Sequence, residues 1–155
     1  MQGKISSSNF RSFGKLIDYP HKDKKGTKRN LWRIIHHSPN NNGWRVAYLV
    51  LRDKSIGRME CHPFSDETFE PVSGRSILFI SKQKSFADIQ CFLLDRPIII
   101  NKGIWHAVIT LDNESELKIT ENHKISSKYW EFGFRVKSLD DLIKKSKSSR
   151  ADDCV

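Results

Sequence analysis

Short apolar-rich segments alternate with polar turns along most of the chain. The segments are rich in Val, Ile, Phe and Trp, and Gly, Pro, Asn or Asp separate them at spacings of about 8 to 12 residues, which is typical of an antiparallel sandwich or barrel. No long helical pattern lies between them, which excludes a parallel α/β fold. The predicted strands are "LWRII", "WRVAYLVLR", "GRMECH", "SILFIS", "ADIQCFLL", "PIIIN", "IWHAVITL", "ELKIT" and "KYWEFGFRV".

Each end of the chain carries a helical pattern instead. "SSNFRSFGKLID" places Phe10 and Phe13 on one side of a short amphipathic helix, with Gly14 as its terminator. "SLDDLIKKSK", from Ser138 to Lys147, begins with a capping serine, continues with acids and ends with lysines, an order that complements the helix dipole. We therefore expect an all-β domain with a short N-terminal helix and a C-terminal helix.

The length of 155 residues is typical of one domain with a full hydrophobic core, so we predict a single domain over 1–155. Its ends, 1–8 and 148–155, are polar, which places the expected ordered core at about 9–147. No apolar run approaches the roughly 20 residues of a membrane helix, and the first residues lack the apolar stretch of a secretory signal. The three cysteines are far apart and have no CxxC spacing. We predict a cytoplasmic protein in a reducing compartment.

The formal net charge of +9 raises the question of a nucleic-acid partner. Residues 1–30 carry eight Lys or Arg against two Asp, and residues 135–155 carry six against four acids. The residues between them carry thirteen basic against twelve acidic side chains, so the central domain is nearly neutral. No aromatic RNA-binding motif accompanies the basic ends, which argues against nucleic acid as the partner.

The stretch "MECHPFSDETF" gathers two carboxylates and an imidazole. Glu60 and His62 are two residues apart, so on an extended backbone both point to one face while Cys61 points to the other. The segment "PFSD" contains good turn formers, so the chain is able to bend and return Glu67 toward the same pair. The alternative interpretation is that these are surface residues of a strand and its turn.

A second candidate segment, "PIIINKGIWHAVITL", turns at "NKG" and continues with His106 after Trp105. Taken alone, His106 shares a face with Ile104 and Val108 and is typical of a core histidine, whereas Trp105 faces the other side and is typical of packing. The joint spacing of both segments, rather than any one residue, favours a clustered site.

The two segments together resemble the two motifs of the cupins. "ExHxxxxE" contains Glu60, His62 and Glu67, and "GxxH" ends at His106, with Glu60 in place of the usual first histidine. The resemblance implies a double-stranded β-helix, the RmlC-like jelly-roll barrel, in which these four side chains converge and bind a divalent metal. Carboxylate and imidazole ligands suit Mn, Fe, Ni or Zn.

A narrower resemblance is to the ureidoglycolate lyase family of that superfamily. "ECHPFSDETFEPV" is similar to its ERHP...QaFiP segment, "NKGIWHAVI" to its GxWH segment, and "FRSFGKLID" to its opening. The matches bracket Phe10 to Leu111 in the right order. Two departures are Glu67, where the family commonly has Gln, and Ala107, where a second histidine commonly follows the first.

This resemblance implies a lyase that splits ureidoglycolate into glyoxylate and urea, or that cleaves a related small hydroxy acid. It assigns the base role to Glu67 or Glu60, acid or orienting roles to His62 and His106, and substrate contacts to Lys102 and Trp105. It also implies a homodimer, for which the edges at "WRVAYLVLR" or "KYWEFGFRV" are candidate pairing surfaces. The alternatives are a non-catalytic or differently specific metal-binding cupin, either a small-ligand sensor or an enzyme of the sugar-isomerase type. Two carboxylates repel an anionic substrate, so the glutamate at position 67 favours a bound metal.

Overall fold

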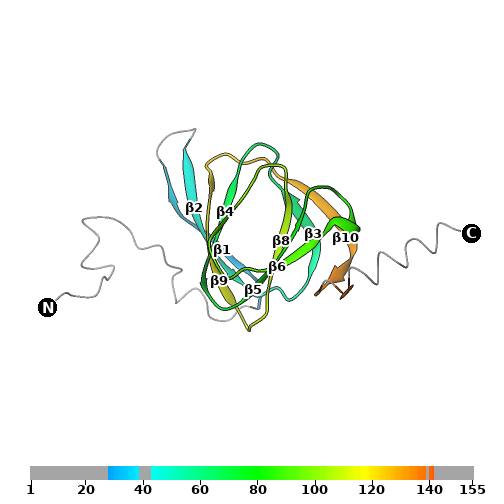
Figure 1. Cartoon of the computed structure of the whole chain (residues 1–155). Coiled ribbons are helices and arrows are strands. Elements are labelled where there is room, and N and C mark those ends of the chain that lie inside the picture. The colour runs from blue at the N-terminus through cyan, green and yellow to red at the C-terminus, as the bar shows by residue number, and fades with distance from the viewer. Residues whose placement is uncertain (1–27, 39–42, 139, 142–155) are drawn as a thin grey trace, which may run out of the picture.

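The computed structural model describes residues 28–38, 43–138 and 140–141, and within them the chain forms two facing antiparallel sheets (Figure 1). The prediction of an all-β fold is confirmed. The strands of sheet A, in spatial order, are β1 (Leu31–His37), β2 (Trp44–Leu51), β9 (Ser115–Asn122), β4 (Glu67–Ser73) and β7 (Ile98–Ile100). The strands of sheet B are β10 (Lys128–Val136), β3 (Ile56–Cys61), β8 (Trp105–Thr110), β5 (Ser76–Ser81) and β6 (Gln90–Leu93).

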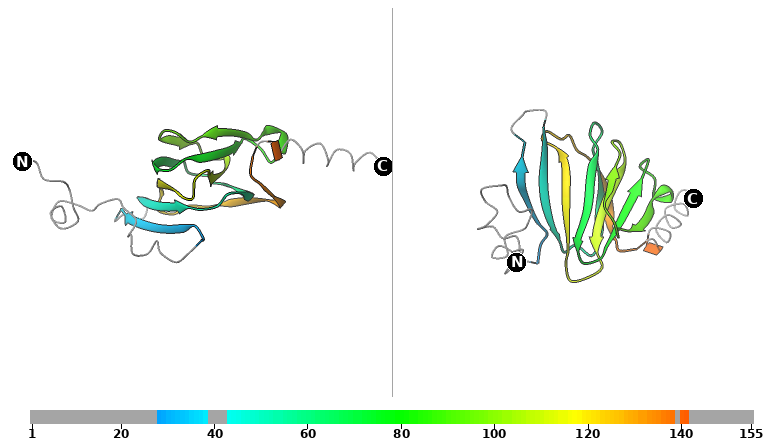
Figure 2. Two further views of the ribbon diagram at one scale, coloured as in Figure 1. Left: turned by 90° about the horizontal axis from the view of Figure 1, so that it is seen from below. Right: turned by 60° about the vertical axis from the view of Figure 1, so that its left-hand side comes forward.

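The space between the sheets holds one hydrophobic core, because each strand turns alternate side chains inward. Ala47, Leu117 and Ile119 of sheet A are buried against Leu78 of sheet B. Figure 2 shows the two layers edge-on, with strands of each sheet running side by side. This core fills part of the interlayer space, and the site residues occupy another part of it.

A second core covers the outward face of sheet B. Met59 and Phe79 are fully buried there, and Trp105 contacts the ring of Trp130 from β10. The short 3-10 helix η2 (Phe86–Asp88) places its first side chain against the same aromatic group. Sheet B is therefore packed on both faces around the middle of β3 and β8.

Two parts of the prediction need correction. The strand "WRVAYLVLR" is β2, and it lies between β1 and β9, so it offers no free edge for a dimer. The other candidate, "KYWEFGFRV", is β10, and it is an edge of sheet B. The segment from Glu67 to Ser73, which was not among the predicted strands, is strand β4. The homodimer itself stays a prediction.

The two predicted helices fall largely outside the described residues. The one at Phe10 lies wholly outside them. Of the C-terminal helix, Asp140 and Asp141 are described and are helical, and the Asp141 N–H donates to the Ser138 hydroxyl at 3.3 Å. The Ser138 hydroxyl thus lies where the predicted cap would place it, but neither predicted helix is seen among the described residues. Within the described ranges no helix has the length and apolar character needed to cross a membrane.

Candidate functional site

Four predicted site residues come together on the inner side of the sandwich. Glu60 lies near the end of β3 and is paired across the sheet with His106 of β8. His62 follows β3 directly, and its carbonyl oxygen accepts the Gly103 N–H at 2.8 Å, which ties the turn before β8 to the end of β3. Glu67 opens β4 on the facing sheet. The first sequence motif thus reaches both sheets, and the second adds His106 to the wall formed by sheet B.

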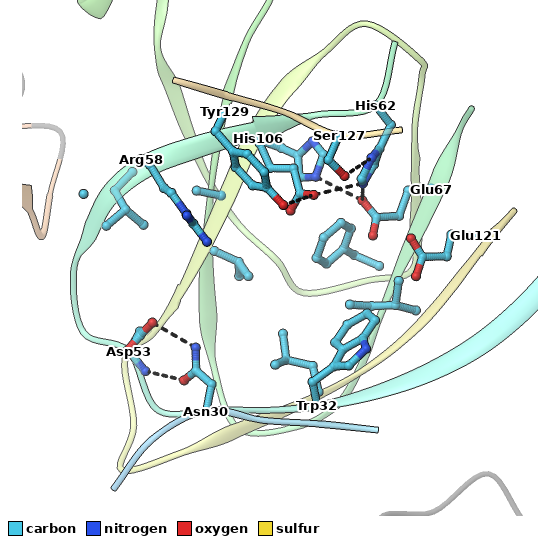
Figure 3. Close-up of a pocket in the computed structure, with 18 of the residues that line it drawn as sticks. Asn30, Trp32, Asp53, Arg58, His62, Glu67, His106, Glu121, Ser127 and Tyr129 are labelled. Atoms are coloured by element: carbon cyan, nitrogen blue, oxygen red, sulfur yellow. Dashed lines mark hydrogen bonds and ion pairs between the residues drawn. The ribbon is translucent and has the colours of Figure 1, made fainter. Parts of the chain in front are cut away.

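The carboxylate of Glu67 is the centre of this cluster (Figure 3). Its Oε2 lies 3.0 Å from Nε2 of His106 and 3.3 Å from Nε2 of His62. All three side chains are buried, whereas Glu60 is partly exposed and its Oε1 lies 3.9 Å from the same His62 nitrogen. Glu67 and the two histidines therefore form a compact group, and Glu60 stands beside it at the edge of the open space.

The orientation of both histidines is set by their Nδ1 atoms. Nδ1 of His62 faces the carbonyl oxygen of Ser126 at 3.3 Å, and Nδ1 of His106 faces that of Ile104 at 3.1 Å. A carbonyl oxygen only accepts hydrogen bonds, so each Nδ1 directed at one donates its N–H. Each Nε2 then faces Glu67, with a lone pair when the ring is neutral and with an N–H when the ring is protonated. Backbone carbonyls hold metal-binding histidines in this way.

Glu67 Oε2 is buried and has no hydrogen-bond partner within the described part of the chain. A carboxylate oxygen facing two imidazole lone pairs needs a positive centre between them, either a proton or a cation. Burial opposes protonation of His62, but the neighbouring carboxylates of Glu67 and Glu60 raise its pKa to about 9. Burial likewise opposes ionisation of Glu67, but the two histidines lower its pKa. A protonated His62 paired with Glu67 is one such positive centre, and a divalent metal bound by these imidazole and carboxylate groups would be the other.

Sequence reasoning missed Glu121, which completes the buried group. It lies on β9 directly opposite Glu67, and its Oε1 accepts from Nε of Arg45 at 2.8 Å. Burial and the charge of Glu67 raise its pKa, against the effect of Arg45. The sequence did contain an indication of its position. Leu117, Ile119 and Glu121 are alternate residues of one strand, so the glutamate points to the same inward face as the two apolar residues.

Two overlapping sets of side chains have the geometry of a metal site. Glu60, His62 and His106 form one, and His62, Glu67 and Glu121 form the other, with the ligand atoms of each set within 4.8 Å of one another. His62 belongs to both. Mixed imidazole and carboxylate ligands suit Mn, Fe, Ni or Zn.

The two predicted substrate contacts lie elsewhere. Trp105 precedes His106 on β8, so it points to the opposite face of sheet B, into the outer core, and Lys84 lies over its ring. Lys102 is exposed on the turn before β8, and its backbone N–H donates to Oδ1 of Asp66 at 2.7 Å. Neither residue lines the cavity beside Glu67.

The cluster lies in the wall of a cavity of about 800 Å³ that opens between the two sheets. Tyr129 of β10 lines it and donates its hydroxyl to Oε1 of Glu60 at 3.2 Å. Arg58 of β3 and Trp32 of β1 line it farther from the histidines (Figure 3). A cavity of this size lies in the range of small-molecule sites, about 300 to 1,000 Å³.

Comparison with known proteins places this geometry in context. No family model matches the chain. It is 23% identical over 148 residues to a ureidoglycolate lyase of Rhizobium leguminosarum bv. trifolii (strain WSM2304), which covers 85% of this chain and 89% of that relative. The chain also aligns with the crystal structure of CapF with the inhibitor 3-isopropenyl-tropolone, at a TM-score of 0.54 and 15% identity over 69% of this chain and 33% of CapF.

An L-ribose isomerase from Acinetobacter sp. DL28 in complex with L-ribose aligns at a TM-score of 0.45 and 11% identity, over 53% of this chain and 49% of the isomerase. The chain spans half or less of the length of these two solved proteins. The match to the lyase, in contrast, runs along most of both chains. The resemblance of this chain to a ureidoglycolate lyase is therefore confirmed.

Proposed function

We propose that this protein is a metal-dependent cupin lyase that cleaves ureidoglycolate or a related small hydroxy acid. The observation that carries the proposal is the buried Oε2 of Glu67, which has no hydrogen-bond partner among the described residues and faces Nε2 of both His62 and His106. Full-length similarity to a ureidoglycolate lyase supports the reaction class. The adjoining cavity gives a small substrate access to the group.

His62, Glu67 and His106 would hold the metal, with Glu121 as a second acid whose charge Arg45 offsets. A divalent ion bound there supplies Lewis-acid polarisation of the substrate hydroxyl and offsets the negative charge of the carboxylates. The positive charge of the ion would offset the repulsion that the two glutamates otherwise exert on an anionic substrate.

Glu60 is the residue best placed to remove the proton of the substrate's carbinol hydroxyl. It is partly exposed in the cavity, and its Oε1 accepts the Tyr129 hydroxyl, so one lone pair is engaged and others face the open space. In the proposed reaction Glu60 removes the proton from the carbinol hydroxyl, the C=O bond of glyoxylate forms, and the C–N bond breaks. The departing urea nitrogen receives a proton through Tyr129, which Glu60 reprotonates, so the protons balance.

The test is release of glyoxylate and urea from one enantiomer of ureidoglycolate by protein loaded with Mn, Fe, Ni or Zn. Glu60→Gln is expected to lower turnover by roughly a hundredfold or more, the scale of a positioned general base, and to keep its metal content. His106→Ala is expected to lose metal and activity together. Loss of metal in Glu60→Gln would instead make Glu60 a ligand, and an inert wild type with every metal would refute the lyase.

A second candidate, a metal-binding cupin of different specificity or without catalysis, is favoured by the glutamate at position 67 where the lyase family commonly has glutamine. Under the lyase proposal with Glu67 as ligand, Glu67→Gln loses metal and turnover. If Glu67 only repels the anionic substrate, the same variant keeps its metal and lowers KM at similar turnover. Metal-loaded protein that is inert in both forms would make the second candidate the leading one.

A further inference from the structure

Arg58 is an arginine of the cavity that nothing in the proposed reaction uses. It lies on β3 two residues before Glu60, so both side chains point to the inner face of sheet B. Its guanidinium carbon lies 4.5 Å from the centre of the Tyr129 ring. In Figure 3 the side chain extends from β3 into the cavity beside that ring.

The described arginines that line the cavity differ in what their guanidinium groups bind. Arg45 donates to Glu121, and Arg135 donates to both the hydroxyl and the carbonyl oxygen of Ser55. Arg58 donates no hydrogen bond within the described part of the chain. Its nearest carboxylate, Glu131, is 3.6 Å away, and more than half of each side chain is exposed. Exposed ion pairs of this kind contribute little to stability, so Glu131 is a weak competitor for the guanidinium.

The position over the Tyr129 ring prepares Arg58 to bind an anion. A guanidinium that uses an aromatic ring as its cation–π partner leaves its N–H donors for other groups, and they match the two oxygens of a carboxylate. The same tyrosine links Arg58 to Glu60, since the Tyr129 hydroxyl donates to that carboxylate.

We propose that Arg58 binds an anionic group of the substrate and so selects organic acids over their uncharged analogues. The cavity is large enough for such an acid. The inference rests on the proposed function in one respect, that Glu60 and the histidines mark the reacting end.

The test is a binding measurement that does not depend on turnover. Glutarate and its monoamide, glutaramate, have the same length and differ by one charge, and each is titrated by calorimetry into the Mn-supplied full-length protein. Arg58→Gln is expected to weaken glutarate binding by about tenfold to a hundredfold, the range for hydrogen bonds between charged groups, and to leave glutaramate nearly unchanged. Arg96→Gln, which removes the same charge from an exposed arginine beside Asp95, is the matched control and should bind glutarate as the wild type does.

Two further variants separate the ring from the hydroxyl. Tyr129→Phe keeps the ring under Arg58, so glutarate binding should persist while turnover falls, and Tyr129→Leu should weaken binding as Arg58→Gln does. Glu131→Gln should tighten binding, since it removes the competing carboxylate. Equal glutarate binding by wild type and Arg58→Gln, or no binding to the wild type at millimolar concentration, would overturn the proposal for Arg58. If glutarate binds better than glutaramate but ureidoglycolate is not cleaved, the proposal for Arg58 is supported and the lyase proposal is refuted.

Discussion

Replacing Glu67 by glutamine is the most direct test of the metal centre. The substitution preserves the shape of the side chain and removes the charge of the atom that both Nε2 nitrogens approach, at 3.0 and 3.3 Å. Changes to metal ligands and their supporting groups lower metal affinity by about tenfold to a hundredfold or more. The effect should therefore be visible as a loss of metal-induced stabilisation.

The magnitude follows from linkage between binding and folding. Metal at a hundred times its Kd stabilises the wild type by about 2.7 kcal/mol, which for a domain of this size raises Tm by about 5 to 11 °C. At the same metal concentration, a tenfold to hundredfold weaker site stabilises Glu67→Gln by only about 0.4 to 1.4 kcal/mol. Each protein is compared with its own chelator-treated form, so that the effect of the substitution on the metal-free protein cancels.

The assay is thermal unfolding with and without Mn, Fe, Co, Ni or Zn, together with elemental analysis of protein purified without chelator. The matched control is Glu70→Gln, on the same strand, because Glu70 pairs with Lys118 rather than with the histidines. An equal Tm shift in Glu67→Gln and the wild type would show that Glu67 is not a ligand. If no metal raises the Tm of the wild type, the metal centre is wrong altogether.

Three other features give predictions about stability and reactivity. Arg45→Met should lower the free energy of unfolding by about 3 to 5 kcal/mol, because it leaves the carboxylate of Glu121 buried without its partner, and adding Glu121→Leu should recover much of the loss in urea denaturation. Gly74→Ala should cost about 1 to 3 kcal/mol by the same assay, because φ is +70° and a Cβ would lie 2.6 Å from the Glu114 carbonyl oxygen; an unchanged midpoint would contradict this. Burial raises the pKa of Cys91 to about 11, so peptide mapping should show that iodoacetamide labels it far more slowly in the native than in the unfolded protein at neutral pH.

The strands could be predicted because alternation and turn residues report burial on a pleated sheet. "SILFIS" coincides with β5 at Ser76–Ser81. Strand β4 was missed because its sequence, "ETFEPVS", contains Pro71 and two glutamates, which are typical of a turn or an exposed segment. Its inward residues are nevertheless Glu67 and Phe69, both buried, so the strand carries a charged side chain toward the core.

The candidate site was predictable where the ligands lie close in sequence, as Glu60 and His62 do, or where a known motif links them. Glu121 and Arg45 could not be placed from local pattern, because their proximity to Glu67 depends on the order of strands β2, β9 and β4 in sheet A. That order is set by contacts between residues far apart in the chain. The same limit explains why β2 was taken for an edge.

The double packing of sheet B has a consequence for how the molecule fluctuates. Met59 and Trp105, on the outward face, are adjacent in sequence to Glu60 and His106, so the backbone that carries the site is held by side chains on both sides. Local opening of β3 and β8 would break two cores at once, whereas opening of the edge strand β1 would not. Amide protons in the middle of β3 and β8 should therefore exchange with solvent only when the whole domain unfolds, and those of β1 much sooner. A ligand that enters the cavity thus meets side chains whose positions are fixed before it arrives.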